Sequence, residues 1–342
     1  MNPKPRLLIT GATGLVGSHL LLHLAQQAVP VRAFVRNKLA AQKRMETVFA
    51  WYKQSPSLIT EWIEWVEGDV LDLGSLEDAL DGIEQVIHTA AVVRESGSSE
   101  RMEKVNVEGT ANLVNLCLEL GIKRFVHLSS VATLGPNPEG LVDEDFFFKY
   151  NPRLSNYALT KYASEQEVWR ACEEGLEAIV LNPAFIIGPS ESMKSSSSVF
   201  TAATNGIPYY TNGFGGYIDV RDVAELAVKC LTVSAKNKRY ILSSENLETR
   251  EFLQVMAKSM NGKVPVKELK EWMIRPAIWF FGLRKLFTGQ EAPFTRSVVR
   301  MAQSRNAFDA SRIIELTGIQ FRPVKVAIAD TAAIMRQIKA ES

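Results

Sequence analysis

Cysteine and histidine are scarce in this chain, and its charges almost cancel. Among 342 residues there are three cysteines and four histidines, and 39 Lys and Arg against 38 Asp and Glu leave a formal net charge of +1. This balance provides no broad cationic field, so nucleic acid is excluded as the expected partner. The cysteines are far apart in helical patterns without metal-ligand spacing, which predicts core residues in a reducing compartment and no metal site: Cys117, Cys172 and Cys230.

Long apolar runs are absent as well. No stretch reaches the roughly 18 apolar residues that a membrane-spanning helix needs. Met1–Pro5 leads directly into an expected strand without the features of a signal peptide. We therefore expect a cytoplasmic protein without a membrane span. The 46% apolar and 23% charged residues are typical of a globular chain and exclude disorder for most of it.

Short apolar segments alternate with longer segments of helical spacing through the first half of the chain. Helices are expected at Leu15–Gln27 and Met102–Leu120. Strands that are almost wholly apolar and separated by helices predict an α/β fold with a doubly wound parallel sheet, the Rossmann architecture. The expected strands are Arg6–Thr10, Val31–Val35, Trp62–Glu67, Gln85–Thr89, Arg124–Ser129 and Ala178–Leu181.

After Leu181, prolines and glycines interrupt this alternation, which resumes once with a helix near Val220–Leu231 and a strand at Arg239–Leu242. We therefore predict a nucleotide-binding Rossmann domain and a smaller, mostly helical lobe that binds the substrate. The serine run Ser195–Ser198 in that lobe is interpreted as a surface loop or a substrate lid. The predicted boundaries are 1–183 with a returning segment at about 218–245 for the domain, and 184–217 with 246–342 for the lobe.

A glycine-rich segment, Thr10–Gly17, follows the first strand and opens the first long helix, which is the context of a dinucleotide fingerprint. Gly11 allows the tight turn, Gly14 lets the backbone approach a pyrophosphate, and Gly17 allows close packing of helix on strand. The amides and dipole of the helix N-terminus favour phosphates. The residues expected to contact the cofactor here are Gly11, Thr13, Gly14, Leu15 and Val16.

The end of the second strand carries no carboxylate that could bind a ribose 2′-hydroxyl, as NAD-binding chains usually have. Arg36 stands there instead and could pair with a 2′-phosphate, assisted by Lys38 or Arg32. This favours NADP, with NADPH preferred over NADH. After the third strand, Asp69 with Val70 is placed to accept a hydrogen bond from the adenine amine, although a plain turn aspartate is the alternative.

Tyr157 and Lys161 are four residues apart in a predicted helix, so both can point into one cleft. A nearby ammonium favours the phenolate of a tyrosine and makes the pair a plausible proton donor and acceptor. Ser129 and Ser130 end a strand upstream, where open α/β sheets bind ligands.

In these motifs the chain resembles the extended short-chain dehydrogenase/reductase family, in its dihydroflavonol 4-reductase-like and 3β-hydroxysteroid dehydrogenase-like branch. The resemblance covers nearly the whole chain, from TGATGLVG at Thr10–Gly17 through SSVATLG at Ser129–Gly135 and YALTK at Tyr157–Lys161 to FDASR at Phe308–Arg312. It implies a catalytic triad of Ser130, Tyr157 and Lys161. It also implies cofactor contacts by Ala90, Ala91, Asn106, Lys161 and Pro183, and a homodimer built on two core helices.

Some features depart from the family pattern or have no assigned role. Asn182 stands where relatives commonly have arginine, so a local ion pair is expected to be missing, and the aromatic segment Met45–Glu64 has no assigned role. The apolar stretch Trp272–Phe281 is interpreted as a lobe helix, an oligomer contact or a membrane-surface anchor. A group of aromatic residues forms either a pocket wall or lobe core: Phe185, Tyr209, Tyr210, Phe214 and Tyr217.

These expectations lead to an NADPH-dependent reductase or dehydrogenase that acts on a partly apolar or aromatic carbonyl or alcohol substrate, with Tyr157 as general acid and base. Two alternatives stay open. One is a sugar-nucleotide epimerase or dehydratase that retains NAD, against which the missing carboxylate near Arg36 argues. The other is a non-catalytic protein that senses NADP(H), against which the retained Tyr157 and Lys161 argue.

Overall fold

A parallel sheet of seven strands forms the centre of the molecule. The computed structural model describes residues 4–93, 99–135, 137, 140–146, 154–190, 198–204, 206–270, 272–273 and 303–341. The strand order is β11-β7-β5-β4-β1-β2-β3, and each neighbouring pair is parallel. The strands are β1 (Leu7–Thr10), β2 (Val31–Val35), β3 (Ile63–Glu67), β4 (Gln85–His88), β5 (Arg124–Leu128), β7 (Ala178–Pro183) and β11 (Lys238–Leu242).

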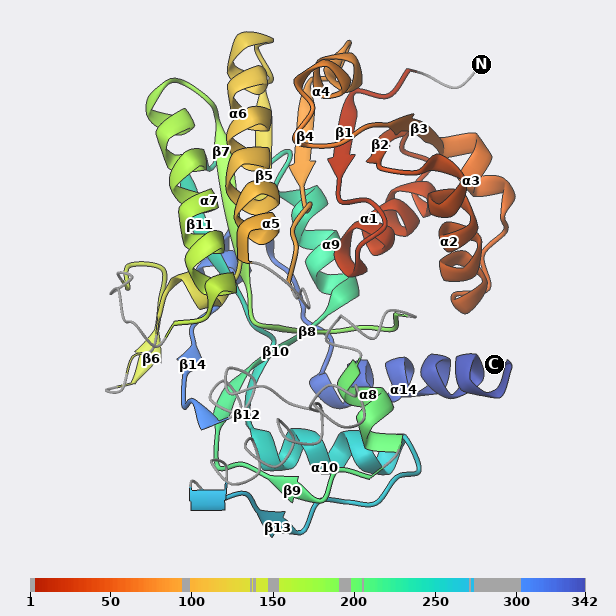
Figure 1. Cartoon of the computed structure of the whole chain (residues 1–342), viewed down its shortest axis with the longest axis vertical. Coiled ribbons are helices and arrows are strands. Elements are labelled where there is room, and N and C mark those ends of the chain that lie inside the picture. Colours follow the sequence, from red (N-terminus) through yellow and green to blue (C-terminus); the bar gives the residue numbers. More distant parts are fainter. Residues whose placement is uncertain are drawn as a thin grey trace.

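Helices cover both faces of this sheet because neighbouring side chains along each strand point to opposite faces. Leu7 and Ile9 of β1 pack with one set of helices, whereas Leu8 between them packs with the other. The first set is α1 (Leu15–Gln26), α2 (Lys38–Trp51), α3 (Ser57–Trp62) and α9 (Val220–Lys229). Figure 1 shows the second set on its own side: α4 (Leu73–Leu80), α5 (Ser99–Glu103), the π-helical turn η1 (Lys104–Glu108), α6 (Gly109–Glu119) and α7 (Asn156–Glu173).

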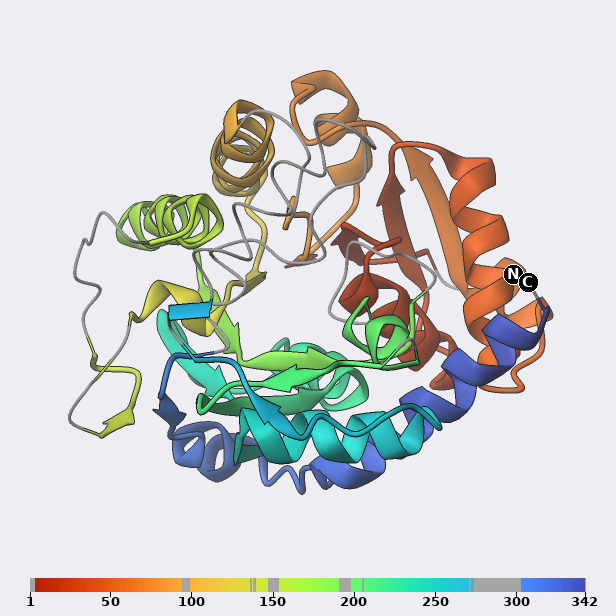
Figure 2. The same cartoon turned by 60° about the horizontal axis from the view of Figure 1, so that its bottom comes forward.

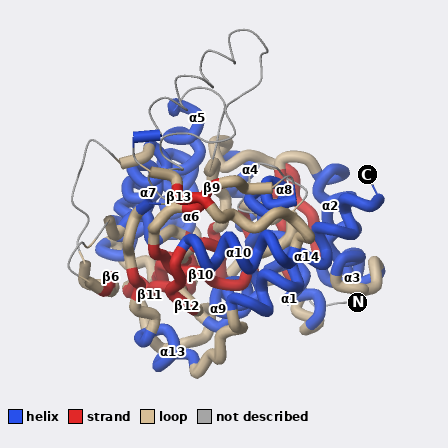
Figure 3. Tube along the Cα trace, turned by 90° about the horizontal axis from the view of Figure 1, so that it is seen from below, coloured by secondary structure: helices blue, strands red, loops and turns tan. Residues whose placement is uncertain are grey.

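A smaller layer lies below the carboxyl ends of the central strands (Figures 1 and 2). Its sheet is β12 (Glu245–Glu248), β10 (Phe214–Asp219) and β8 (Phe185–Ile187), against which α10 (Thr249–Ser259) and α14 (Val324–Glu341) pack, as Figure 3 shows from below. The remaining elements are the 3-10 turn η2 (Val131–Thr133), β6 (Leu141–Val142) with β14 (Ala307–Phe308), β9 (Tyr209–Tyr210) with β13 (Lys267–Glu268), α8 (Ser198–Thr204) and α13 (Ser311–Thr317).

The doubly wound Rossmann sheet predicted from the sequence is confirmed, and all three cysteines are free and buried as expected. Within the described ranges, no helix combines the length and the apolar character that a bilayer crossing needs. Residues 195–197 of the serine run and 274–281 of the apolar stretch lie outside the described residues, so their interpretations are not addressed by the structure.

The first turn of the fold brings three backbone segments into direct contact. Gly11 has φ of 69°, and a Cβ atom there would lie 2.5 Å from the backbone nitrogen of Ala90, just after β4. A Cβ atom on Gly17 would lie 2.3 Å from the carbonyl oxygen of Gly11. Helix α1 therefore sits on its own preceding turn at a distance that only glycine permits.

We predict that Gly17→Ala lowers the free energy of unfolding by about 1–3 kcal/mol, because the methyl group would meet backbone atoms that cannot move aside alone. Gly74→Ala is the matched control, since a Cβ atom there comes no closer than 3.7 Å to another atom, the Asp72 Oδ1. The control is expected to gain about 0.5–1 kcal/mol from helix propensity. Urea denaturation of both variants tests this, and equal stabilities would contradict the packing argument.

Candidate active site

The carboxyl ends of β1, β4 and β5 meet at one edge of the central sheet, beside the N-terminus of α1 (Figure 1). The chain leaves β1 toward β2 on one side and later places β4 on the other, so β1 and β4 flank the point where the strand order reverses. Open α/β sheets bind ligands in the crevice at such a point. Most of the predicted site residues lie at this edge.

The predicted phosphate-binding turn has a helix N-terminus without a side-chain cap. Gly14 is the N-cap residue of α1, and its own amide donates to the Gly11 carbonyl oxygen at 2.9 Å. Thr13 and Leu15 are half-buried and Val16 is buried. The amides of a first helical turn have no partners inside the helix, so an uncapped N-terminus at this edge fits a pyrophosphate.

Arg36 follows β2 and is exposed, and the described residues offer it no hydrogen bond or ion pair. Of the two residues that could assist Arg36, Arg32 is engaged elsewhere, because its guanidinium donates to the carbonyl oxygens of Ala79 and Asp81 and pairs with Glu64. Arg32 is thus held by α4 and β3. Of the three basic residues considered at this strand, Arg36 and Lys38 remain available.

Asp69 forms a turn in the structure. Its Oδ1 accepts a hydrogen bond from the Leu71 amide at 3.0 Å, and its own amide is 3.3 Å from Ser75 Oγ. Asp69 therefore has the role of a turn aspartate, which the sequence analysis gave as the alternative, and its contact with adenine remains a prediction. Val70 is buried against Gly109 of α6, where a Cβ atom would come within 2.6 Å of its side chain.

Ser130 and Tyr157 come together from distant parts of the sequence. Ser130 is the N-cap of η2, and its Oγ accepts a hydrogen bond from the Ala132 amide at 3.2 Å. Tyr157 lies in the first turn of α7, which Ser155 caps. Desolvation raises the pKa of Tyr157, and a hydrogen bond with the Ser130 side chain opposes that rise. The neighbouring Ser129 is different, because its hydroxyl points to the buried Glu165.

Lys161 is buried one turn after Tyr157, and its Nζ donates to the Leu128 carbonyl oxygen at 2.8 Å. Burial lowers the pKa of Lys161 to about 8, and the charge of Glu165 acts in the opposite direction. The sequence predicted that Lys161 would lower the pKa of Tyr157. Desolvation dominates at the tyrosine here, and the ammonium donates to the carbonyl oxygen at the end of β5, so the effect of Lys161 on Tyr157 remains a prediction.

Asn106 lies in the π-helical turn between α5 and α6 and is buried. Its amide accepts from the Val92 amide at 2.7 Å and donates to the Val92 carbonyl at 3.1 Å, and it reaches Thr160 of α7. Asn106 therefore holds the segment after β4, which contains the half-buried Ala90 and Ala91. Pro183 is buried at the end of β7. Cofactor contacts by these residues remain predictions.

A family model described as "NAD dependent epimerase/dehydratase family" matches residues 7–242. The chain belongs to this family. It is an NAD(P)-dependent enzyme of the extended short-chain dehydrogenase/reductase group, in the dihydroflavonol 4-reductase-like branch. The resemblance noted in the sequence is thus confirmed.

Curated relatives of this family member include reductases. It is 28% identical over 94% of its length to a protein provisionally named dihydroflavonol 4-reductase from Synechocystis sp., covering 92% of that protein. It is 29% identical over 73% of its length to cinnamoyl-CoA reductase 1 of Petunia hybrida, covering 76% of that protein. Among solved structures, gox2253 is 30% identical with a TM-score of 0.77, covering 97% of this chain and 98% of that one.

The structure answers two questions that the sequence left open. Phe185 and Tyr217 form lobe core with Phe252, since Tyr217 stacks on Phe252 at 4.2 Å between ring centroids and Phe185 meets both edge-on. The aromatic segment at Met45–Glu64 packs on α1, where the Tyr52 hydroxyl lies 2.9 Å from His19 Nε2. Aromatic composition alone cannot separate core from pocket wall.

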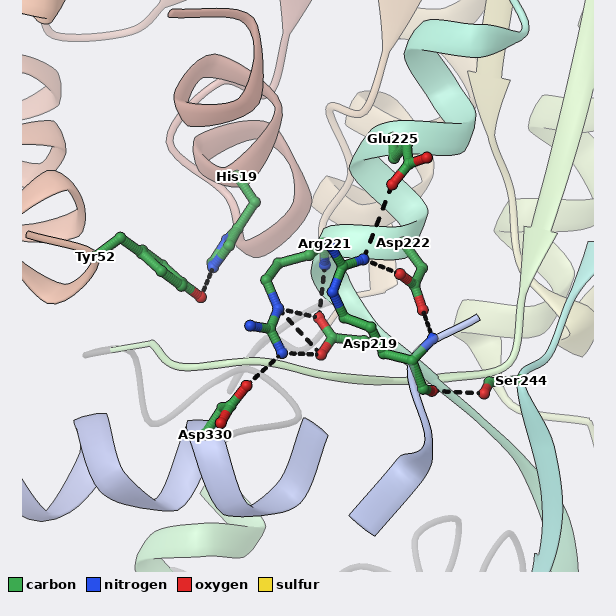
Figure 4. A network of polar contacts seen from close by, with 9 residues as sticks. His19, Tyr52, Asp219, Arg221, Asp222, Glu225, Ser244 and Asp330 are labelled. Carbon is green, nitrogen blue, oxygen red and sulfur yellow. Dashed lines mark hydrogen bonds and ion pairs between the residues drawn. The ribbon is translucent and has the colours of Figure 1, made fainter. Parts of the chain in front are cut away.

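Ion pairs connect the nucleotide-binding part of this enzyme to its last helix (Figure 4). Asp219 caps α9 and pairs with Arg221, which also reaches Asp330 of α14 at 2.8 Å. Asp222, in the first turn of α9, accepts hydrogen bonds from the side chain and backbone of Arg322. Asp219 and Asp222 therefore cap and brace the helix α9.

Two stacked histidines, His88 and His127, lie buried on adjacent strands below Lys161. His88 bonds to the hydroxyls of Thr10 and Thr110 at 2.6 and 2.9 Å. Neither ring nitrogen of His127 has a partner among the described residues. Burial, and then the Lys161 charge, lowers the pKa of His88 to about 3 and holds the pKa of His127 well below its usual value. Both rings are neutral at pH 7.

We predict that stability falls as the pH drops below about 6.5, because the unfolded chain then binds protons that the buried rings cannot. His127→Leu should remove about 1.4 kcal/mol per pH unit of this loss and change stability at about pH 7.5 by less than about 1 kcal/mol. The matched His88→Leu should cost about 1–3 kcal/mol at about pH 7.5, since it strips Thr10 and Thr110 of their partner, and about 1.4 kcal/mol less at about pH 5.5, because it removes a buried neutral ring as well. Urea denaturation at about pH 7.5 and 5.5 measures both. A His127→Leu variant with unchanged pH dependence would contradict the assignment.

Proposed function

We propose that this enzyme is an NADPH-dependent reductase of a ketone or aldehyde, with Tyr157 as the general acid. The observation that carries the proposal is the meeting of Ser130 and Tyr157 at the carboxyl edge of the sheet, with Lys161 one helical turn away. Two hydroxyl groups at one point can both reach a single carbonyl oxygen.

The residues at this edge fit a dinucleotide. The uncapped N-terminus of α1 and the Gly11 turn, which approaches Ala90 without a side chain between them, leave backbone amides for a pyrophosphate. When bound, the reduced nicotinamide supplies the hydride that adds to the carbonyl carbon. All other roles in the proposal belong to the side chains of this chain.

Tyr157 donates its phenolic proton to the carbonyl oxygen as negative charge develops there, and the product is the alcohol. Ser130 hydrogen-bonds the same oxygen and stabilises that charge. Lys161 holds the ribose of the nicotinamide and, as a cation, favours the phenolate that Tyr157 leaves behind. The tyrosine then takes a proton from solvent, which restores the starting state.

Arg36 supports NADPH as the cofactor. Its guanidinium is exposed at the end of β2, without a protein partner in the described part of the chain, and can form paired hydrogen bonds with a 2′-phosphate. The neighbouring carboxylate, Glu67 of β3, already accepts the Lys38 amide at 2.9 Å. Arg36 is therefore the exposed cation at this strand end that supports binding of a 2′-phosphate.

The lobe over residues 184–217 and 246–342 is proposed to select the substrate. Relatives named cinnamoyl-CoA reductase and sterol demethylase protein B support a partly apolar or aromatic carbonyl compound. Tyr209, Tyr210 and Phe214 are half-buried and remain candidates for contact with it, unlike the core residues Phe185 and Tyr217.

We predict that Tyr157→Phe lowers kcat by about 10²–10⁴-fold while NADPH binding stays intact, because only the proton donor is removed. The assay follows NADPH and NADH absorbance with aromatic, steroidal and aliphatic carbonyls. Tyr162→Phe, on the same helix, is the control and should retain activity. Purified protein that carries bound NAD would favour the epimerase or dehydratase, and tight NADPH binding without turnover on any carbonyl would favour a sensor.

We predict that Arg36→Leu raises KM for NADPH by about tenfold or more and leaves KM for NADH unchanged, since one charge-assisted contact is worth about 1.5–3 kcal/mol. Arg32→Leu on the same strand is the matched control. Its guanidinium is held by Glu64 and two carbonyl groups, so the choice of cofactor should not change. A parent enzyme that prefers NADH would overturn the cofactor proposal.

A further inference from the structure

Glu165 of α7 is a fully buried carboxylate with four donors around it. Its Oε2 accepts from Ser129 Oγ at 2.8 Å and from Asn182 Nδ2 at 3.2 Å. Its Oε1 accepts from Trp169 Nε1 at 3.3 Å and pairs with Arg239 Nη2 at 2.7 Å. Both oxygens of this buried carboxylate therefore have hydrogen-bond or ion-pair partners.

This carboxylate lies in line with the proposed site. Tyr157, Lys161 and Glu165 follow one another at steps of four residues, so they occupy one face of α7. Glu165 is the anion that opposes the desolvation of Lys161. The other groups that act on Lys161 or lie close by are His88 of β4 and His127 of β5, which are both neutral. Glu165 is therefore the negative charge that faces Lys161 among the described residues.

Asn182 of β7 connects Glu165 to the turn that carries Ser130. The same Nδ2 atom that contacts Glu165 lies 3.1 Å from the Ser130 carbonyl oxygen and 3.0 Å from Thr133 Oγ1. Ser129, which donates to Glu165, is the residue just before Ser130. Two hydrogen-bonded routes, one through Ser129 and one through Asn182, thus fix the Ser130 turn to the buried carboxylate.

Arg239 supplies the cation that the sequence led us to expect would be missing. The resemblance led us to expect a missing ion pair at Asn182, and this expectation is wrong because β11 provides a guanidinium from the neighbouring strand. Arg239 also lies over the Trp169 ring, 5.5 Å from its centroid. Its side chain is 21% exposed, so the pair reaches the surface on one side only.

We propose that Glu165 is a positioning residue that keeps Lys161 cationic and holds the Ser130 turn in place for the proposed reductase reaction, on which this inference rests. Glu165 touches neither substrate nor cofactor in this role. It acts through Lys161 and through Ser129 with Asn182. Arg239 sets how much of its negative charge Lys161 experiences.

A purely structural role makes a different prediction. Removing one partner of a buried ion pair destabilises a protein whichever partner is removed. A structural Glu165–Arg239 pair would thus lower stability in both single variants without opposite effects on Lys161. The positioning role predicts opposite effects, because one variant removes the anion near Lys161 and the other removes the cation that offsets it.

The test compares Glu165→Gln with Arg239→Met across a pH series. Glu165→Gln should move the alkaline limb of kcat down by about one pH unit, since Lys161 loses the anion that holds its proton. At pH values above the shifted limb, kcat of Glu165→Gln should therefore be about tenfold lower than kcat of the parent. Arg239→Met should move the limb up, because it removes the cation that offsets Glu165 while Ser129, Asn182 and Trp169 still bind the carboxylate. Limbs that move together, or not at all, would overturn the proposal.

A second readout separates this inference from the reductase proposal. NADPH affinity, followed by cofactor fluorescence over the same pH series, depends on Lys161 through the ribose and needs no carbonyl substrate. If the parent turns over no carbonyl, the reductase proposal fails alone, and opposite shifts in the affinity profiles still support the role of Glu165. The double variant Glu165→Gln with Arg239→Met keeps the site neutral. It should fold and retain the lowered limb, and an unshifted limb in the double variant would contradict the proposal.

Discussion

Backbone contact at the Gly11 turn is the constraint on which the other parts of the molecule depend. Because α1 lies directly on this turn and the turn lies directly against the residues after β4, the helix N-terminus can point only to the edge between β1 and β4. The opposite side of α1 packs on α9, and α9 in turn is tied to α14 and to Arg322 by ion pairs. A change at the glycine turn would therefore reach both the phosphate site and the last helix of the chain.

The buried polar groups behind the site follow a common rule, since a group taken out of water needs partners inside the protein. Lys161 donates to a carbonyl oxygen and lies near the Glu165 carboxylate, and Glu165 has four donors, one each from β7, α7, β11 and the residue after β5. Asn106 uses both ends of its amide on one backbone residue, Val92. These contacts hold Ser130, Tyr157 and the segment after β4 at fixed places on a sheet edge where the strands themselves have ended.

The sequence predicted the central sheet well because its strands are short, continuous apolar runs, and the observed ends differ by one or two residues. The glycine turn could be predicted equally well, because its residues are close together in the sequence. The Glu165–Arg239 pair could not be predicted from the sequence, because it depends on the register in which Arg239 of β11 lies beside Val180 of β7. The two-residue strands of the lower layer, such as β9 and β13, carry no periodic signal that could have found them.

The end of β2 shows why fold alone does not separate a reductase from an epimerase. UDP-glucose 4-epimerase of Thermotoga maritima has a TM-score of 0.73 to this chain at 17% identity, which reflects the shared fold. In this chain the polar residues at the ends of β2 and β3 have different hydrogen-bond partners. Asn37 caps α2, Glu67 is occupied by the Lys38 amide, and Arg36 extends into solvent. An exposed guanidinium without a partner among the described residues favours a 2′-phosphate over a bare ribose, and this local feature underlies the proposal of a reductase that releases its cofactor rather than an enzyme that retains it.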